Sequence, residues 1–319
     1  MLKFLLCPTC AKPLKLKTNS RRKDEIIEGE LKCSCGQNYP IIGGIPRFIP
    51  SENRSNEQKS FGLQWTRYKL IHDKAFLDFY NSGNIKDVFM KKTKFKPSDL
   101  KNRLVLDAGC GFGRYTIAAN QLGADVIAVD LSEAVESCYE NAKGMEGIHV
   151  VQADIFNLPF TTNIFDLIYS IGVIHHTPNA HTAFSKISKY LKTKGKMYVE
   201  VYQKGPFVRE IINSLLRAIT TRLPHNLLFT LCYVPWLIAS IPFLGRIIGL
   251  FFPMSKIFID NFDWYSPKYQ SHHTPSEVLG WFEENGFKHS EITNPSSLPS
   301  ILQNLSGGYG RVIGVQGKR

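Results

Sequence analysis

The sequence predicts an α/β fold with a doubly wound, mostly parallel sheet, a small cysteine-containing module before it and a helical insertion within it. Three observations carry this prediction. From about residue 100 onward, apolar β-branched runs alternate with segments of helical spacing, which is typical of a parallel sheet covered on both faces. Four cysteines form two close pairs near the N-terminus. Residues 223–245 contain no charged side chain.

The composition is that of a globular protein. The 319 residues are 43% hydrophobic, which is enough for one large domain and a small one. The start MLKFLLCPTC has a short apolar run and no small-residue cleavage site, so we expect no secretion signal and a cytoplasmic protein. Seven cysteines in a reducing compartment favour metal ligands over disulfides.

The net charge of +12 is concentrated at the front of the chain. Residues 1–103 hold 21 Lys and Arg against 10 Asp and Glu, whereas residues 104–319 hold 18 against 17. Such a field attracts anions, which include RNA, phospholipid headgroups and acidic proteins, without selecting among them. A solvated basic face is an equally good explanation of the charge.

The two cysteine pairs predict a structural zinc site. Cys7 and Cys10 form one knuckle, and Cys33 and Cys35 form another after a 22-residue gap. Four thiolates can bind one tetrahedral ion, which replaces the core that so short a segment cannot build. Such a site is closed to substrate. The second knuckle is CxC where CxxC is usual, and four reduced cysteines without metal are the alternative.

The tail YPIIGGIPRFIP, residues 39–50, ends the cysteine module with a Gly-Ile-Pro turn. With the two knuckles, it resembles a small zinc-ribbon module that is fused to, or partnered with, methyltransferases. The resemblance implies a zinc-ribbon domain over residues 1–50. The polar run after Pro50 has the composition of a linker.

Residues 51–100 are expected to contain this linker and an aromatic lid segment. Phe61, Trp65 and Tyr68 fall on one stripe at helical spacing. In the resembling family a segment at this position often lies over the cofactor. Packing of the stripe in the core is the alternative.

The stretch VLDAGCGFGRY, residues 105–115, predicts a nucleoside site. An apolar run ends in a glycine-rich turn, and helical spacing follows. The glycines do not fit the dinucleotide pattern, because Arg114 or Thr116 stands where its third glycine belongs. Glycines let backbone N–H groups approach a ligand, and Asp130, which ends a second strand, can accept from both ribose hydroxyls.

Further strands complete the alternating pattern. Asp154 comes just after a third strand, and FDLIYSIGVIHHTP, residues 165–178, is a buried strand that opens into a loop. A turn at Gly195 and a fifth strand are predicted next. Ligands of such sheets bind at the carboxyl ends of the strands, where these side chains fall.

These motifs in series resemble those of class I S-adenosylmethionine-dependent methyltransferases. D-x-G-x-G-x-G, which begins at Asp107, matches the first motif of that family, and the GVIHHTP region resembles its small-molecule branch. The resemblance implies a seven-stranded, Rossmann-like sheet within residues 101–319. It also implies S-adenosylmethionine as the methyl donor, with Asp130 at the ribose and Asp154 at the adenine.

The residues that the resemblance assigns to the cofactor lie in the glycine loop and at the ends of the next three strands. They are Asp107, Ala108, Gly109, Cys110, Gly111, Gly113, Asp130, Leu131, Asp154, Ile155 and Ile171. Two of the acids have structural alternatives, since Asp107 can cap a turn and Asp154 can cap a helix.

His175 and His176, on the loop after the fourth strand, are the candidate catalytic residues. Methyl transfer needs an aligned nucleophile, and it needs a general base only if the reacting atom of the acceptor carries a proton. At this edge of the sheet either histidine can act as base or orient the acceptor. The alternative is that one histidine packs inward and the other caps the next helix.

A second histidine pair, His272 and His273, precedes a capping box at 274–277. The pair could serve as metal ligands, but this interpretation is disfavoured because no carboxylate or cysteine nearby in the sequence completes a ligand set.

An insertion at about 205–259 is not needed by the sheet. Pro235 and Pro242 interrupt its apolar run and leave it near the lower limit of a membrane span. We therefore expect helices that lie on a membrane surface or cover an apolar substrate cavity, with flanking cations that suit an anionic interface. A helical cap buried against the domain, or in a dimer contact, is the alternative.

The sequence therefore predicts an S-adenosylmethionine-dependent methyltransferase with structural zinc, acting on a small, hydrophobic or lipid-linked acceptor. A second interpretation is an RNA methyltransferase that uses the basic zinc ribbon for substrate binding. A third is a non-catalytic, membrane-associated protein that binds the cofactor. A donor site is shared by many chemistries, so the acceptor atom is not encoded in these motifs.

Overall fold

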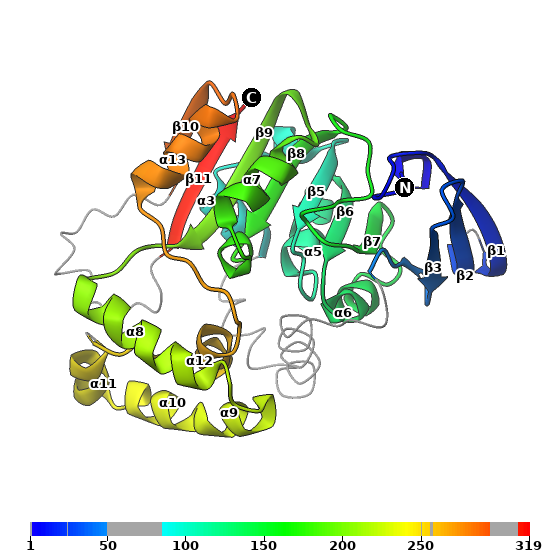
Figure 1. Cartoon of the computed structure of the whole chain (residues 1–319). Coiled ribbons are helices and arrows are strands. Elements are labelled where there is room, and N and C mark those ends of the chain that lie inside the picture. Colours follow the sequence, from blue (N-terminus) through cyan, green and yellow to red (C-terminus); the bar gives the residue numbers. More distant parts are fainter. Residues whose placement is uncertain (1, 24, 50–84, 250, 256–257, 294–311) are drawn as a thin grey trace.

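The larger of two sheets forms the centre of the molecule (Figure 1). The computed structural model describes residues 2–23, 25–49, 85–249, 251–255, 258–293 and 312–319. The proposed lid residues Phe61, Trp65 and Tyr68 lie outside this described part of the chain.

Seven strands form the larger sheet in the order β10-β11-β9-β8-β5-β6-β7. The strands β5 to β9 pair in parallel, and β11 runs antiparallel to both of its neighbours. This arrangement confirms the predicted mostly parallel, Rossmann-like sheet. The strands are β5 (Leu104–Ala108), β6 (Asp125–Asp130), β7 (Ile148–Gln152), β8 (Phe165–Ile171), β9 (Leu191–Tyr202), β10 (His289–Ile292) and β11 (Val312–Lys318).

Helices cover both faces of this sheet, which explains why its strands are continuous apolar runs. Val105 packs with the helices of one face, and Leu106, the next residue along β5, packs with those of the other. The first face carries α3 (Ile85–Thr93), α4 (Pro97–Leu100), α5 (Arg114–Gln121) and α6 (Ala134–Asn141). The second carries α7 (Ala180–Ser188) and α13 (Pro275–Glu284).

The turn predicted at Gly195 is a bulge within β9. Phe165 of β8 pairs with Leu191, but Leu167 pairs with Lys196, so the residues between loop out of register. The left-handed residue there is Lys194, with φ 67°. A strand that pairs with both β8 and β11 can absorb extra residues in this way without breaking.

The cysteine module forms the smaller, antiparallel sheet in the order β1-β2-β3-β4. Its strands are β1 (Leu14–Arg22), β2 (Glu25–Cys33), β3 (Asn38–Ile42) and β4 (Ile45–Pro46). The module docks on the edge strand β7, where Phe48 N–H donates to the Gln152 carbonyl over 2.8 Å. Leu5, Tyr39 and Phe48 belong to the same buried cluster as Phe160 of the large domain. The two modules therefore share one core.

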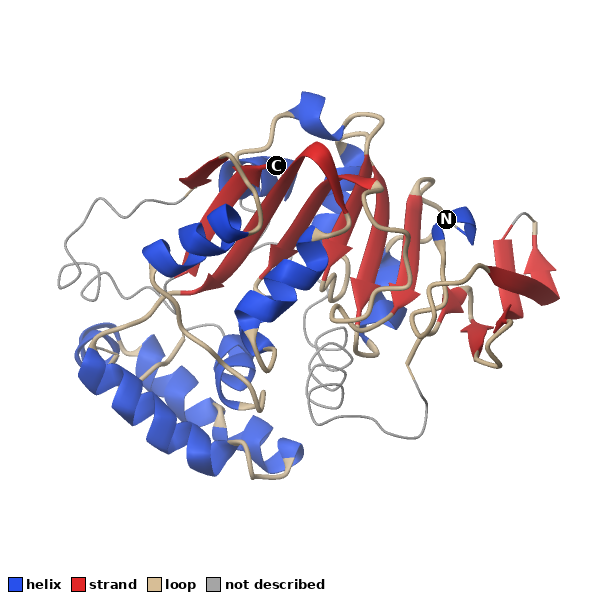
Figure 2. Cartoon of the chain, turned by 45° about the horizontal axis from the view of Figure 1, so that its top comes forward, coloured by secondary structure: helices blue, strands red, loops and turns tan. Residues whose placement is uncertain are grey.

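The insertion after β9 forms a layer of helices beyond the end of that strand (Figure 2). Its helices are α8 (Phe207–Thr220), α9 (His225–Leu231), α10 (Tyr233–Ser240), α11 (Pro242–Ile248) and α12 (Phe258–Tyr265). No helix in the described part of the chain is both long and apolar enough to cross a bilayer.

Helix α8 turns polar residues inward and apolar residues outward. Asn213 and Arg217 are buried, and they bond to Trp264 and to the chain that follows it. Phe207 and Leu215, in contrast, are 78% and 65% exposed. Exposed apolar side chains in such number are typical of an interaction surface.

Candidate functional site

The glycine loop connects β5 to α5 at the carboxyl edge of the sheet. Gly109, Gly111 and Gly113 have φ values of 92°, 51° and 88°, in the left-handed region that favours glycine. A Cβ at Gly109 would lie 2.4 Å from the methyl carbons of Val173, in the loop after β8. The loop backbone and the loop after β8 therefore lie in direct contact, which larger residues would prevent.

Asp130, at the end of β6, is bonded to the glycine loop. Its Oδ2 accepts a hydrogen bond from Gly111 N–H over 2.9 Å, and its Oδ1 accepts from the N–H and hydroxyl of Ser132 over 2.8 and 2.7 Å. Burial raises the pKa of Asp130, and these hydrogen bonds oppose the rise. The carboxylate thus lies beside the loop at the place where the sequence predicts the ribose.

Asp107 lies beneath the loop. Its Oδ2 accepts hydrogen bonds from the Thr116 hydroxyl over 2.6 Å and from the Tyr169 hydroxyl over 3.1 Å. Burial raises the pKa of Asp107 to about 7. These hydrogen bonds link α5 and β8 to Asp107 at the end of β5, so this carboxyl group stabilises the elements that carry the loop.

The other predicted cofactor residues lie at the same edge. The Ala108 carbonyl accepts from the Ser170 hydroxyl over 2.7 Å, and Cys110 is buried. Asp154 accepts from Phe156 N–H over 2.9 Å, which is a local turn and not a helix cap. Leu131, Ile155 and Ile171 follow or end the strands β6, β7 and β8.

This edge therefore combines a glycine loop at the start of a helix with an acid at the end of each of the next two strands. Residues 106–199, which contain all of these features, match the model of the methyltransferase domain family. This part of the chain is a class I, S-adenosylmethionine-dependent methyltransferase domain.

Known relatives match only part of the chain. An uncharacterized protein of Methanocaldococcus jannaschii is 30% identical over 139 residues, 44% of this chain and 57% of that protein. Phosphoethanolamine N-methyltransferase 3 of Arabidopsis thaliana is 28% identical over 166 residues, 51% of this chain and 32% of that enzyme. The chain thus spans about half, or less, of these relatives.

A solved structure with a similar outline is magnesium protoporphyrin IX methyltransferase from Synechocystis with bound S-adenosylhomocysteine. It superimposes with a TM-score of 0.49 at 16% identity, over 82% of this chain and 97% of that one.

The residues of the methyltransferase domain fit its donor. Helix α5 has no acidic residue in its first turn, so its N-terminus favours a negative group of the ligand. Asp130 offers carboxylate oxygens to a diol at the adjacent strand end. When bound, S-adenosylmethionine supplies a methyl group on a positively charged sulfur.

His175 and His176, the predicted catalytic residues of the domain, are both buried in the short helix η2 (Ile174–His176) after β8. The His175 ring lies against that of Tyr202, with 3.9 Å between centroids, and neither of its nitrogens has a hydrogen-bond partner within the described ranges. His176 Nδ1 lies 3.1 Å from the Tyr269 carbonyl oxygen. Burial lowers the pKa of both histidines, which favours neutral rings.

Neither histidine caps the following helix. The cap of α7 is Asn179, whose side chain accepts from Thr182 N–H over 2.8 Å. The capping box predicted before α13 is confirmed, with Thr274 and Glu277 bonded reciprocally.

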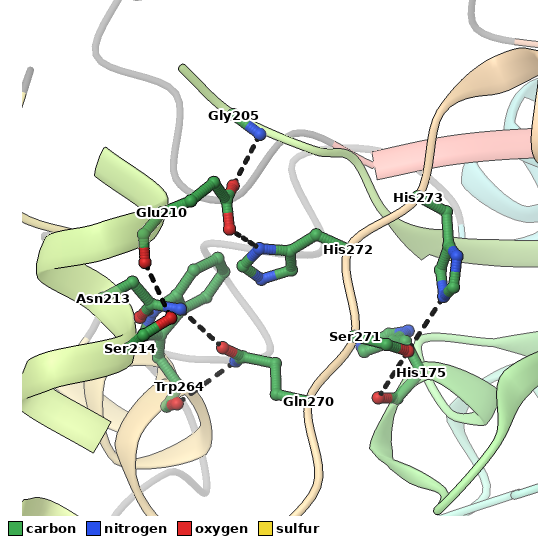
Figure 3. A network of polar contacts seen from close by, with 10 residues as sticks. All are labelled: His175, Gly205, Glu210, Asn213, Ser214, Trp264, Gln270, Ser271, His272 and His273. Carbon is green, nitrogen blue, oxygen red and sulfur yellow. Dashed lines mark hydrogen bonds and ion pairs between the residues drawn. The ribbon is translucent and has the colours of Figure 1, made fainter. Parts of the chain in front are cut away.

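The structure brings a carboxylate to His272 that the sequence did not indicate. Glu210, on α8, places Oε2 2.5 Å from His272 Nδ1, and its Oε1 accepts from Gly205 N–H over 2.6 Å (Figure 3). The two residues are 62 positions apart and belong to different elements. No local spacing could have revealed the pair, because the insertion alone brings α8 to this segment.

The four cysteines of the module lie together. Their sulfur atoms are all within 4.8 Å of one another, and Cys7 Sγ lies 3.7 Å from Cys35 Sγ. Zn–S bonds of about 2.3 Å in a tetrahedron require sulfurs roughly 3.8 Å apart. The donor set and its size therefore suit a closed zinc site.

Proposed function

We propose that this chain transfers the methyl group of S-adenosylmethionine to a small acceptor with an apolar body, which the helical insertion helps to bind. The observation that carries the proposal is an apolar cavity in the insertion, whose helices pack on Tyr202 at the end of β9. The relative named for phosphoethanolamine also acts on a small molecule, which supports an acceptor of that size.

The cavity has a volume of about 450 Å³. Its lining comes from the insertion and is apolar, as in pockets that bind most of a small ligand. Its lining includes Leu216 and Thr220 of α8, Leu228 of α9, Val234 of α10 and Tyr265 of α12. An alkyl or isoprenoid chain has the chemistry to fill such a cavity.

Donor binding is tested by calorimetric titration of S-adenosylmethionine and S-adenosylhomocysteine. We expect micromolar binding that Asp130→Ala weakens at least tenfold, because the variant loses both the ribose acceptor and the bond to Gly111. Asp87→Ala, in the first turn of α3, is the control. Failure of the folded protein to bind either compound would overturn the proposed donor site.

Acceptor binding is tested with 1-decanol as a probe. Val234 and Leu237 are both on α10 and are 56% and 55% exposed, but only Val234 lines the cavity. We expect Val234→Trp to weaken decanol binding at least tenfold and Leu237→Trp to leave it unchanged. Equal binding by the two variants would contradict an acceptor site in this cavity.

The outward apolar face of α8 supports contact with a lipid surface, from which a lipid-linked acceptor would enter. Leu215 and Ser214 are neighbours on this helix and both are exposed. In flotation with vesicles of phosphatidylcholine and phosphatidylglycerol, Leu215→Asn should reduce binding and Ser214→Asn should not. If vesicle binding depends on salt concentration and is the same in both variants, the basic module and an anionic partner such as RNA are favoured instead.

We also propose that Cys7, Cys10, Cys33 and Cys35 hold one structural zinc ion. Metal analysis should find one equivalent per chain, and Cys35→Ser should lose it. Because the module shares its core with the large domain, we expect chelation to lower the thermal stability of the whole chain. A fully stable, metal-free protein would contradict this proposal.

A further inference from the structure

Glu210 and His272 form a partly buried contact where the insertion meets the segment before α13. His272 has 9% of its side chain exposed, and its Nδ1 faces the Glu210 carboxylate. Its other ring nitrogen, Nε2, is buried and has no hydrogen-bond partner in the described part of the chain. A buried polar atom without a partner is unusual and points to a missing ligand.

Hydrogen bonds on both sides of His272 in the chain fix its position. The segment before it is bonded to the loop after β8, since Ser271 N–H donates to the His175 carbonyl over 2.9 Å. The segment after it is bonded to the end of β9, since His273 N–H donates to the Tyr202 carbonyl over 2.9 Å. Figure 3 shows the His272 ring directed from this segment toward Glu210 on α8.

A chain of contacts connects His272 to the glycine loop. Gly109 lies against Val173, and Val173 precedes η2, which contains His175. His175 in turn bonds through its carbonyl to Ser271, next to His272. These contacts place His272 three steps from the glycine loop, at the carboxyl edge of the sheet.

We infer that Glu210 and His272 form a catalytic pair that takes the proton of an acceptor hydroxyl during methyl transfer. The inference rests on the proposed function and names its acceptor class. Glu210 holds the proton of His272 on Nδ1, so Nε2 presents a lone pair to the acceptor. A carboxylate that orients a histidine in this way is the arrangement that general-base catalysis requires.

The step balances in atoms and charge. The hydroxyl oxygen forms a bond to the methyl carbon as the carbon–sulfur bond breaks, and the electron pair of that bond stays on sulfur. The hydroxyl proton passes to Nε2 of His272. The positive charge that leaves sulfur thus ends on an imidazolium beside the Glu210 carboxylate, where the ion pair stabilises it.

Several titratable groups surround Glu210 and His272, and their charges affect how the protonation of the pair depends on pH. Burial raises the pKa of Glu210, but the hydrogen bond and charge of His272, with Arg209, lower it to a net value below the ordinary one. His175, His176 and His273, whose pKa values burial lowers, lie close enough to His272 for its charge to lower them further. Tyr202 and Trp264 lie against the His272 ring. Two further carboxylates lie in this cluster: Asp263 lies near His176, and Glu277 Oε2 lies 3.7 Å from His273 Nδ1.

The first test needs no acceptor. Nitrogen-15 NMR of the histidine side chains reports which ring nitrogen carries a proton. In the neutral form of the His272 ring we expect the proton on Nδ1, and we expect Glu210→Gln to shift the balance between the two tautomers. A neutral ring with its proton on Nε2 would overturn the inference, whatever substrate the protein uses.

The second test compares two probe acceptors, 4-octylphenol and decanoate, with labelled S-adenosylmethionine. The phenol must lose a proton and the carboxylate need not. We expect His272→Gln to reduce methylation of the phenol about 100-fold, as loss of a general base does, and to leave that of decanoate within threefold. His273→Gln, on the neighbouring residue, is the matched control and should behave as the wild type.

The outcomes separate the two proposals. If calorimetry finds no binding of S-adenosylmethionine, the proposed function fails. If the donor binds and the phenol is methylated equally by wild type and His272→Gln, the catalytic pair is wrong and the proposed function stands. If neither probe is methylated, the NMR result decides the inference.

Discussion

The backbone N–H of Gly111 donates a hydrogen bond of 2.9 Å to Oδ2 of Asp130. The glycine loop and the acid at the end of β6 are therefore one unit, in which the shape of the loop depends on the carboxylate predicted to bind ribose. A substitution of Asp130 changes both the ligand contact and the loop. Variants of different chemistry can separate the two effects.

Asp130→Asn should weaken S-adenosylmethionine binding less than Asp130→Ala does. The amide oxygen can still accept from Gly111, so the loop is retained, but the amide cannot accept from both ribose hydroxyls with a full charge. By calorimetry we expect a loss of less than about 1.4 kcal/mol, which is less than tenfold in the dissociation constant. Identical losses in the two variants would show that the bond to Gly111 contributes nothing to binding.

Gly109→Ala should reduce both stability and donor binding. The added Cβ would lie 2.4 Å from Val173 and would also be strained at φ 92°. Gly144, with φ 80° and no atom within 4 Å of an added Cβ, is the matched control, because Gly144→Ala carries the backbone strain alone. In urea unfolding we expect about 1 kcal/mol for the control and about 2–3 kcal/mol for Gly109→Ala. Equal losses would refute the close contact with Val173.

The stability contributed by Asp107 should decrease as pH rises. Its pKa is raised to about 7 in the folded protein, against about 3.9 in the unfolded chain. The folded state therefore holds a proton that the unfolded state has lost, and up to about 4 kcal/mol of stability is lost between pH 4 and pH 7. Asp107→Asn, which cannot ionise, should flatten this part of the pH–stability profile in urea titrations. An unchanged slope would contradict the raised pKa.

Lys92→Met should destabilise the protein by leaving a buried carboxylate unpaired. Lys92 of α3 forms an ion pair with Glu200 of β9, whose side chain is only 8% exposed. We expect a loss of about 2–3 kcal/mol in the free energy of unfolding, and a partial recovery in Lys92→Met/Glu200→Gln. Lys91→Met, at an exposed position on the same helix, should change stability by less than about 0.5 kcal/mol.

Much of the geometry at the carboxyl edge of the sheet could be predicted because its signals are local. The positive φ angles of the glycine loop, Asp130 at a strand end and Asp154 just after another all follow from short stretches of sequence. The order of strands and helices followed from hydrophobic period in the same way. The bulge in β9 could not be predicted from hydrophobic period, because its position depends on how β9 pairs with its neighbouring strands.

Residue type alone did not distinguish an acid that supports the glycine loop from an acid that is placed to contact the ligand. Asp107 and Asp130 belong to the same run of motifs, but their carboxylates have different partners. The Asp107 carboxylate accepts hydrogen bonds from the hydroxyls of Thr116 and Tyr169. The Asp130 carboxylate accepts from the backbone N–H groups of Gly111 and Ser132. The partner hydroxyls come from α5 and β8, and their direction is set by how these elements pack on β5.

The sequence by itself determined the class of sheet, the glycine loop, the cysteine pairs and the helical character of the insertion, since each depends on spacing within a few tens of residues. Only the tertiary structure decided that the cysteine module shares the core of the large domain and that Glu210 meets His272. Both arise from contacts between distant segments, where packing of whole elements, and not local propensity, determines which side chains meet.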